Sequence, residues 1–94
     1  MAVATSRPRI LVVDDDEPLR VMVSRMLKAA GYEVRQSSDG AEVTDALRRE
    51  SIDLILSDIS MPRRGGIETL IDIRKEHPLL PVVFMTGAFP TDSG

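Results

Sequence analysis

The chain has 94 residues, of which 43% are hydrophobic and 29% are charged, and its formal net charge is −3 at pH 7. This size and composition predict one soluble globular domain, and the acidic excess gives no reason to expect nucleic-acid binding, which needs a basic face. Because the chain has no cysteine, no apolar run long enough to span a membrane and no apolar segment typical of a secretory signal, we expect no disulfide, no thiolate metal site and a cytoplasmic location.

The chain begins with small and polar residues, so residues 1–8 predict a flexible N-terminal arm ahead of a domain at residues 9–94. This domain opens with an unbroken apolar run at 10–13, which is typical of a strand buried on both faces of a parallel sheet. The run ends in the acidic residues Asp14–Glu17, and Pro18 follows them. Because acids and a proline favour the first turn of a helix, we expect a helix to begin there.

Apolar residues recur at helical spacing after Pro18, and Gly31 is a favourable residue for ending that helix. We expect its buried stripe, with the methionines filling the core, to be Leu19, Met22, Val23, Met26, Leu27 and Ala30. Residues 32–37 alternate between apolar and polar, which predicts a strand near an edge of the sheet. A turn at Asp39 and Gly40 then leads into a second helix.

The second helix is expected to run to about Arg49 and to bury Val43, Ala46 and Leu47. Residues 52–57 predict another apolar strand, which ends at Asp58, and residues 61–66 predict a loop from their proline and glycine content. The inward residues of a third helix at 67–76 are expected to be Ile67, Leu70, Ile71 and Ile73. A fourth strand at 80–85 ends at Thr86.

Strands and helices therefore alternate along the whole sequence. This order predicts an α/β fold with a doubly wound parallel sheet and right-handed crossovers. In such sheets, ligands bind outside the carboxyl ends of the strands. Asp14 and Asp15 follow the first strand, Asp58 follows the third and Thr86 follows the fourth. If the first strand lies between the second and the third, these side chains converge at one edge of the sheet.

The chemistry of these residue types points to a metal-dependent phosphoryl site. Carboxylates that lie close together repel one another, and a hard cation such as Mg²⁺ relieves that repulsion. A carboxylate can also form an aspartyl phosphate, while a metal and a hydroxyl neutralise the transferring group. Each feature has a plainer interpretation, since Asp14–Glu17 can be a solvated acidic run and Asp58 can cap a turn. Their joint occurrence at strand ends favours the phosphoryl site.

The segments ILVVDD with a following acid and proline, LILSDISMP, a Gly-Gly turn and VVFMTG occur in this order from about residue 9 to residue 87. As a set they resemble the flavodoxin-like receiver domain of two-component response regulators. The resemblance implies that Asp58 accepts the phosphoryl group and that Asp14, Asp15 and Asp58 hold Mg²⁺. It also implies that the backbone carbonyl of Ser60 ligates the metal and that the Thr86 hydroxyl binds a phosphoryl oxygen.

The resemblance further implies a histidine kinase or a phosphotransfer protein as the partner, and no enzymatic activity beyond phosphorylation and dephosphorylation of Asp58. Receiver domains continue with a fourth helix, a fifth strand that ends in a lysine and a fifth helix. This sequence stops before them, and Lys28 and Lys75 fall in predicted helices, so we expect a receiver fold that is incomplete at its C-terminus. The exposed edge of the sheet then predicts either self-association through that edge or a chain that is only marginally folded.

Two other functions fit part of the pattern. A non-phosphorylated, receiver-like dimerisation module would account for the missing lysine but not for the intact acids. A Mg²⁺-dependent phosphatase with an aspartyl nucleophile would carry a DxDx(T/V) motif, and here Pro18 stands where Thr or Val belongs, although Asp14 and Asp16 match. The sequence therefore predicts a phosphoacceptor module of a phosphorelay, with no nucleic-acid or membrane partner.

Overall fold

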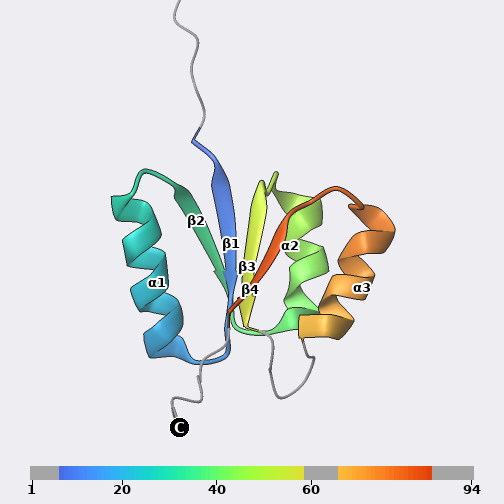
Figure 1. Ribbon diagram of the computed structural model, residues 1–94, viewed down its shortest axis with the longest axis horizontal. Coiled ribbons are helices and arrows are strands. Elements are labelled where there is room, and N and C mark those ends of the chain that lie inside the picture. The colour runs from blue at the N-terminus through green and yellow to red at the C-terminus, as the bar shows by residue number, and fades with distance from the viewer. Residues whose placement is uncertain (1–6, 59–65, 86–94) are drawn as a thin grey trace, which may run out of the picture.

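The computed structural model describes residues 7–58 and 66–85 of the chain. In chain order the elements are β1 (Arg9–Val13), α1 (Glu17–Ala29), β2 (Glu33–Ser37), the short 3-10 helix η1 (Gly40–Glu42), α2 (Val43–Arg49), β3 (Leu54–Asp58), α3 (Gly66–Glu76) and β4 (Val82–Met85) (Figure 1). The predicted order of strands and helices is therefore confirmed. The third and fourth strands each begin two residues later than predicted.

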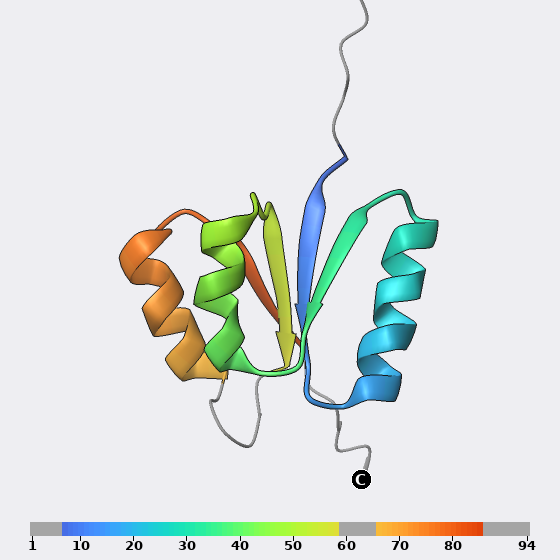
Figure 2. The ribbon, with the colours of Figure 1, turned by 180° about the vertical axis from the view of Figure 1, so that it is seen from behind.

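The four strands form one parallel sheet in the order β2-β1-β3-β4. All strands point the same way, so their carboxyl ends meet at the lower edge in Figure 1, and Figure 2 shows the same arrangement from behind. This is the doubly wound, flavodoxin-like arrangement that the sequence predicts. It also confirms that the first strand lies between the second and the third, which is the condition for the strand-end acids to meet.

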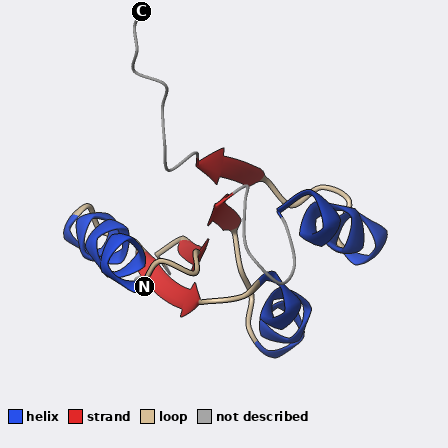
Figure 3. Cartoon of the chain, turned by 90° about the horizontal axis from the view of Figure 1, so that it is seen from below, coloured by secondary structure: helices blue, strands red, loops and turns tan. Residues whose placement is uncertain are grey.

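Helices cover the two faces of the sheet unequally. Of the described helices, α1 lies on one face, while α2 and α3 lie on the other (Figure 3). The core under α2 and α3 consists of Leu11, Val13, Val43, Leu47, Ile55 and Ile73. The core under α1 consists of Ile10, Val12 and Val34, with Val23 and Leu27 of the helix packed against them. Because β1 contributes to both cores, its sequence is an unbroken apolar run.

Both ends of α1 follow the sequence signals. The side chain of Asp16 caps the first turn by accepting a hydrogen bond from the backbone N–H of Leu19 at 3.2 Å. At the other end Gly31 has a φ of 104°, and Tyr32 donates its N–H to the carbonyl of Leu27 at 3.1 Å. Glycine adopts this left-handed conformation without steric cost, so the helix ends where the sequence predicts.

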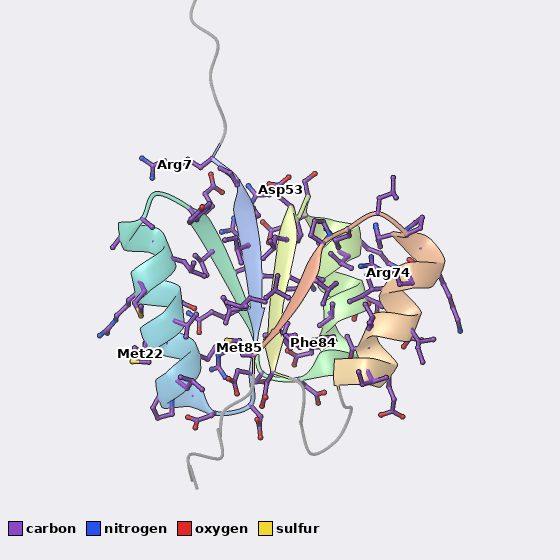
Figure 4. All side chains as sticks on the ribbon, in the orientation of Figure 1. Arg7, Met22, Asp53, Arg74, Phe84 and Met85 are labelled. Carbon is purple, nitrogen blue, oxygen red and sulfur yellow. The ribbon has the colours of Figure 1, made fainter. Side chains whose placement is uncertain are left out.

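The predicted buried stripe of α1 is partly wrong. Val23 and Leu27 pack on the sheet, but Met22 and Met26 are 51% and 63% exposed and Ala30 is also exposed. Figure 4 shows Met22 projecting from α1 on the side away from the strands. Successive helical residues are about 100° apart, so the apolar arc of this helix is wider than the face that a single sheet contacts.

The predicted buried face of α3 is also wrong in part. Ile73 is 1% exposed as expected, and Thr69, which was not predicted, is 3% exposed. Ile67 and Ile71, in contrast, are 52% and 55% exposed. The two pairs are two residues apart, which places them about 200° apart around the helix axis. The helix therefore buries Thr69 and Ile73 and turns Ile67 and Ile71 away from the described core.

The second helix behaves as predicted, since Val43 and Leu47 are buried and Ala46 packs against the same core. Most of the predicted loop at 61–66 lies outside the described residues, and its last residue, Gly66, is the first residue of α3. Of the predicted arm, only residues 7 and 8 are described, and both are exposed. Among the described helices, none combines the length and the apolar character that crossing a bilayer requires.

Candidate metal and phosphoryl site

The carboxyl edge of the sheet carries a cluster of three carboxylates. Asp14 and Asp15 directly follow β1, and Asp58 is the last residue of the neighbouring strand β3. One carboxylate oxygen from each of the three residues lies within 4.8 Å of the others. The structure thus brings together the three acids that the sequence singles out, because parallel pairing of β1 with β3 aligns their carboxyl ends.

Asp14 is the most deeply placed member of the cluster and is 1% exposed. Its N–H donates to the carbonyl of Ser37 at 3.0 Å, which extends the β1–β2 pairing by one residue. Its carboxylate accepts a hydrogen bond from the N–H of Asp16 at 3.0 Å, and its carbonyl accepts one from the Arg20 guanidinium at 2.8 Å. The residue is therefore held through its amide, its carbonyl and its side chain.

The surroundings of Asp14 disfavour its negative charge. Burial raises the pKa of this carboxyl above its ordinary value, and the N–H of Asp16 lowers it in part. Repulsion by Asp58, and then by Asp15 and Asp16, raises the pKa further. A raised pKa at a carboxylate surrounded by like charges indicates a place where positive charge would be favourable.

A hard divalent cation fits this donor set. All three side chains offer oxygen, which Mg²⁺ and Ca²⁺ prefer, and neither sulfur nor imidazole nitrogen belongs to the cluster. The burial differs among the three carboxylates, with Asp14 buried, Asp58 half-buried and Asp15 exposed. The cluster therefore combines one buried carboxylate, Asp14, with one exposed carboxylate, Asp15. This arrangement suits an ion that keeps some of its water.

Asp58 is the last residue of β3 and lies at the carboxyl edge of the sheet. In the parallel pairing of β3 with β4, Asp58 is the register partner of Met85, which is the last residue of β4. The next residue in the sequence is Thr86. Figure 4 shows Phe84 and Met85 at the same end of the sheet. The Ser57 hydroxyl donates to the carbonyl of Asp58 at 3.0 Å. The other two predicted site residues, Thr86 and Ser60, lie outside the described residues, so their roles stay predictions.

Two polar residues that sequence reasoning did not single out lie beside the cluster. Arg20, in the second turn of α1, donates to the carbonyl of Asp14, and it also donates to the side-chain oxygen of Gln36 on β2 at 3.0 Å. A signal was present, because Arg20 lies at i−3 from Val23 on the sheet side of an amphipathic helix. An arginine on that side needs polar partners, and a strand end supplies them.

Comparison with known proteins gives one family. The sequence matches the response regulator receiver domain over residues 10–92. The CAI-1 autoinducer sensor kinase/phosphatase CqsS of Vibrio cholerae is 43% identical over 82 residues, which are 84% of this chain and 12% of that protein. The DNA-binding transcriptional regulator NtrC of Escherichia coli is 40% identical over 84 residues, which are 89% of this chain and 18% of that protein. The chain thus spans less than a fifth of the length of these relatives.

Solved structures show the same fold. The chemotaxis protein CheY4 of Vibrio cholerae superposes with a TM-score of 0.84 at 32% identity, over 92% of this chain and 74% of that chain. The response regulator TrrA of Thermotoga maritima, in complex with Mg(2+)-BeF, superposes with a TM-score of 0.81 at 31% identity, over 92% of this chain and 76% of that chain. With its parallel sheet, its strand-end carboxylates and these matches, the chain belongs to the response regulator receiver domain family.

Proposed function

We propose that this chain is a phosphoacceptor module in which Asp58 receives a phosphoryl group in a Mg²⁺-dependent step. The observation that carries the proposal is the cluster of Asp14, Asp15 and Asp58, whose carboxylate oxygens lie within 4.8 Å of one another. Membership of the receiver family supports it, as does the similarity to TrrA, which was solved with Mg(2+)-BeF. The proposal describes a protein that is itself modified, with no turnover of a separate substrate.

The three acids have different tasks in this proposal. Asp14 and Asp15 would hold Mg²⁺ together with Asp58, and the bound ion would supply positive charge to the oxygens of the transferring group. Asp14 suits the role of a fixed ligand because it is 1% exposed and hydrogen-bonded through its carboxylate and its backbone. Burial and the neighbouring carboxylates disfavour the negative charge of Asp14, as the raised pKa of its carboxyl indicates, so a bound cation would stabilise that charge.

Asp58 suits the role of the acceptor because it is half-buried and ends a central strand. A carboxylate oxygen of Asp58 attacks the phosphorus of a phosphohistidine, the bond from nitrogen to phosphorus breaks, and a bond from oxygen to phosphorus forms. The released imidazole keeps the electron pair of the broken bond and then takes up a proton. We also propose, from the family resemblance, that the Ser60 carbonyl ligates the metal and that the Thr86 hydroxyl contacts a phosphoryl oxygen.

The partner in this proposal is a histidine kinase or a phosphotransfer protein, and we propose that the chain itself acts in the cytoplasm. The relatives that match this chain include proteins named as a sensor kinase/phosphatase and as a transcriptional regulator. We propose in addition that copies of this chain associate with one another through the open side of the sheet, because β4 is an edge strand among the described elements.

The test is phosphorylation by acetyl phosphate, followed by intact mass spectrometry. We expect the wild-type chain to gain the mass of one phosphoryl group with Mg²⁺ and none after chelation with EDTA. The Asp58→Asn variant should gain nothing, because it retains the shape of the side chain but lacks the nucleophilic carboxylate. Asp45→Asn is the matched control, since Asp45 is exposed on α2 and belongs to a different part of the fold. A folded wild-type chain that gains no mass, or a gain that persists in Asp58→Asn, would contradict the proposal.

A further inference from the structure

Arg20 connects three elements at the carboxyl edge of the sheet. The residue belongs to α1, and its guanidinium donates one hydrogen bond to the carbonyl of Asp14, which follows β1, at 2.8 Å. It donates another from Nε to the side-chain oxygen of Gln36 on β2 at 3.0 Å. Since Gln36 is on the edge strand and pairs with Val12 of β1, both acceptors lie at adjacent strand ends.

The carbonyl that Arg20 contacts belongs to the peptide that joins Asp14 to Asp15. A peptide unit is planar, so a hydrogen bond to its carbonyl restricts the orientation of the whole unit and of the residues on either side. The N–H of Asp14 is already held by the carbonyl of Ser37 at 3.0 Å. With the Arg20 contact added, both the N–H and the carbonyl of Asp14 are hydrogen-bonded. These two contacts restrict the direction that the backbone takes from Asp14 to Asp15.

The chemistry of the guanidinium fits this task. Its donors are arranged in a rigid planar fork, so one hydrogen bond to Gln36 sets the direction of the other. A lysine in the same place has one flexible ammonium and cannot reproduce both directions at once. The exposed hydrogen bond from Arg20 to Gln36 therefore orients the part-buried hydrogen bond from Arg20 to the carbonyl of Asp14.

We propose that Arg20 is a positioning residue of the acidic site, which orients the Asp14–Asp15 peptide so that both carboxylates face Asp58. The inference rests on the proposed metal-dependent function of the site. Arg20 acts through the backbone of Asp14, and its partner Gln36 holds the guanidinium in place. The positive charge of Arg20 by itself repels a metal cation, so positioning and charge act on Mg²⁺ affinity in opposite directions.

This difference in sign gives a direct test by calorimetric titration of the full chain with Mg²⁺. Arg20→Lys keeps the charge and loses the fork, and Arg20→Met keeps the aliphatic stem and loses both. We expect both variants to bind Mg²⁺ roughly tenfold more weakly, the lower end of the range for residues that orient metal ligands. Gln36→Met should weaken binding in the same direction by a smaller factor. Arg25→Met is the control, because Arg25 is exposed on the same helix and its loss changes the net charge equally.

A second measurement needs no metal. In the ¹⁵N-labelled chain, the amide resonance of Asp15 reports on the peptide whose carbonyl Arg20 contacts. We expect this resonance to shift in Arg20→Lys and Arg20→Met and to stay in place in Arg25→Met, with circular dichroism showing that each variant is folded. Unchanged Mg²⁺ affinity in the folded Arg20 variants would overturn the inference. So would wild-type affinity in Arg20→Lys, or tighter binding in Arg20→Met, because charge alone would then explain the effect.

The outcome is separable from that of the proposed function, because neither measurement involves phosphorylation. If the wild-type chain binds Mg²⁺ and the Arg20 variants lose affinity, the positioning role is supported even where acetyl phosphate leaves no phosphoryl group on Asp58. If acetyl phosphate modifies Asp58 in the wild type but Mg²⁺ affinity is the same in every variant, the positioning role alone is overturned.

Discussion

At the scale of single residues, Asp14 is a buried carboxyl that lies close to two other carboxyls. This carboxylate is 1% exposed and shares its surroundings with two other carboxylates. Burial raises the pKa of its carboxyl, and repulsion by Asp58 adds to the effect. A residue that opposes the stability of the metal-free fold in this way is typical of a site that is built for a ligand of opposite charge.

We therefore expect Asp14→Asn to stabilise the chain in the absence of divalent ions. Asparagine keeps the oxygen that accepts the N–H of Asp16 and removes the charge, so the free energy of unfolding should rise by about 1 kcal/mol, the ordinary scale of one substitution. The same variant should lose most of its Mg²⁺ affinity. Chemical denaturation with EDTA, and again with Mg²⁺, measures both effects.

The pH dependence of this gain has a definite sign. A carboxyl whose pKa is raised by folding destabilises the native state at pH values above that pKa, and the penalty is lost as the carboxyl protonates. The stabilisation by Asp14→Asn should therefore be greatest near neutral pH and shrink as the pH falls through the raised pKa. A gain that grows toward acid pH would contradict this account of the site.

At the scale of elements, α3 shows that a pattern of apolar residues predicts a helix but does not by itself predict which of its faces is buried. In α3, Ile67 and Ile71 form one apolar pair, and Thr69 with Ile73 forms the pair that the sheet buries. Sequence spacing favours the pair with two isoleucines. The structure buries the other one because α3 contacts α2 and the sheet from a single direction, and that contact selects the Ile73 side.

This orientation predicts a contrast between two chemically identical substitutions in one helix. Ile73→Ala should lower the free energy of unfolding by about 2 to 4 kcal/mol, because it opens a cavity in the core. Ile71→Ala should change it by less than about 0.5 kcal/mol, since Ile71 is 55% exposed. Urea denaturation of the two variants measures the contrast. Equal losses in both would show that α3 sits with a different face toward the sheet.

At the scale of the whole molecule, the two edges of the sheet differ in composition. The edge strand β2 has the sequence EVRQS, whose charged and polar side chains disfavour pairing with another strand. The other edge strand among the described elements, β4, has the sequence VVFM. Of the described helices, α1 is the one on that face of the sheet, and Val83 of β4 is 47% exposed. An apolar edge strand with an exposed valine favours association.

We expect the wild-type chain to associate with increasing concentration, as measured by light scattering. Val83→Lys should shift the chain toward the monomer, because a charge on an edge strand opposes pairing and Val83 is 47% exposed. Leu79→Lys is the matched control, since Leu79 is 92% exposed, lies just before β4 and changes the charge equally. A wild-type chain that stays monomeric across concentrations would count against association.

The sequence by itself determined the order of the elements and the acids at the strand ends. The apolar strand runs, the acids and Pro18 at the start of α1 and the stop at Gly31 are local signals, and the acids follow their strands directly in the chain. Once the structure places β1 beside β3, parallel pairing brings Asp14 and Asp15 next to Asp58. Ser60 and Thr86 lie outside the described residues, so their predicted roles stay predictions.

Only the tertiary structure decided which helix faces are buried and which side chains support the site. Met22 and Ile71 belong to apolar stripes that the sequence favours, yet they are exposed, because burial depends on where each helix lies across the sheet. The contact of Arg20 with Asp14 and Gln36 depends on the same placement. Local pattern specifies which residues can be buried or bonded, and the packing of helices on the sheet selects among them.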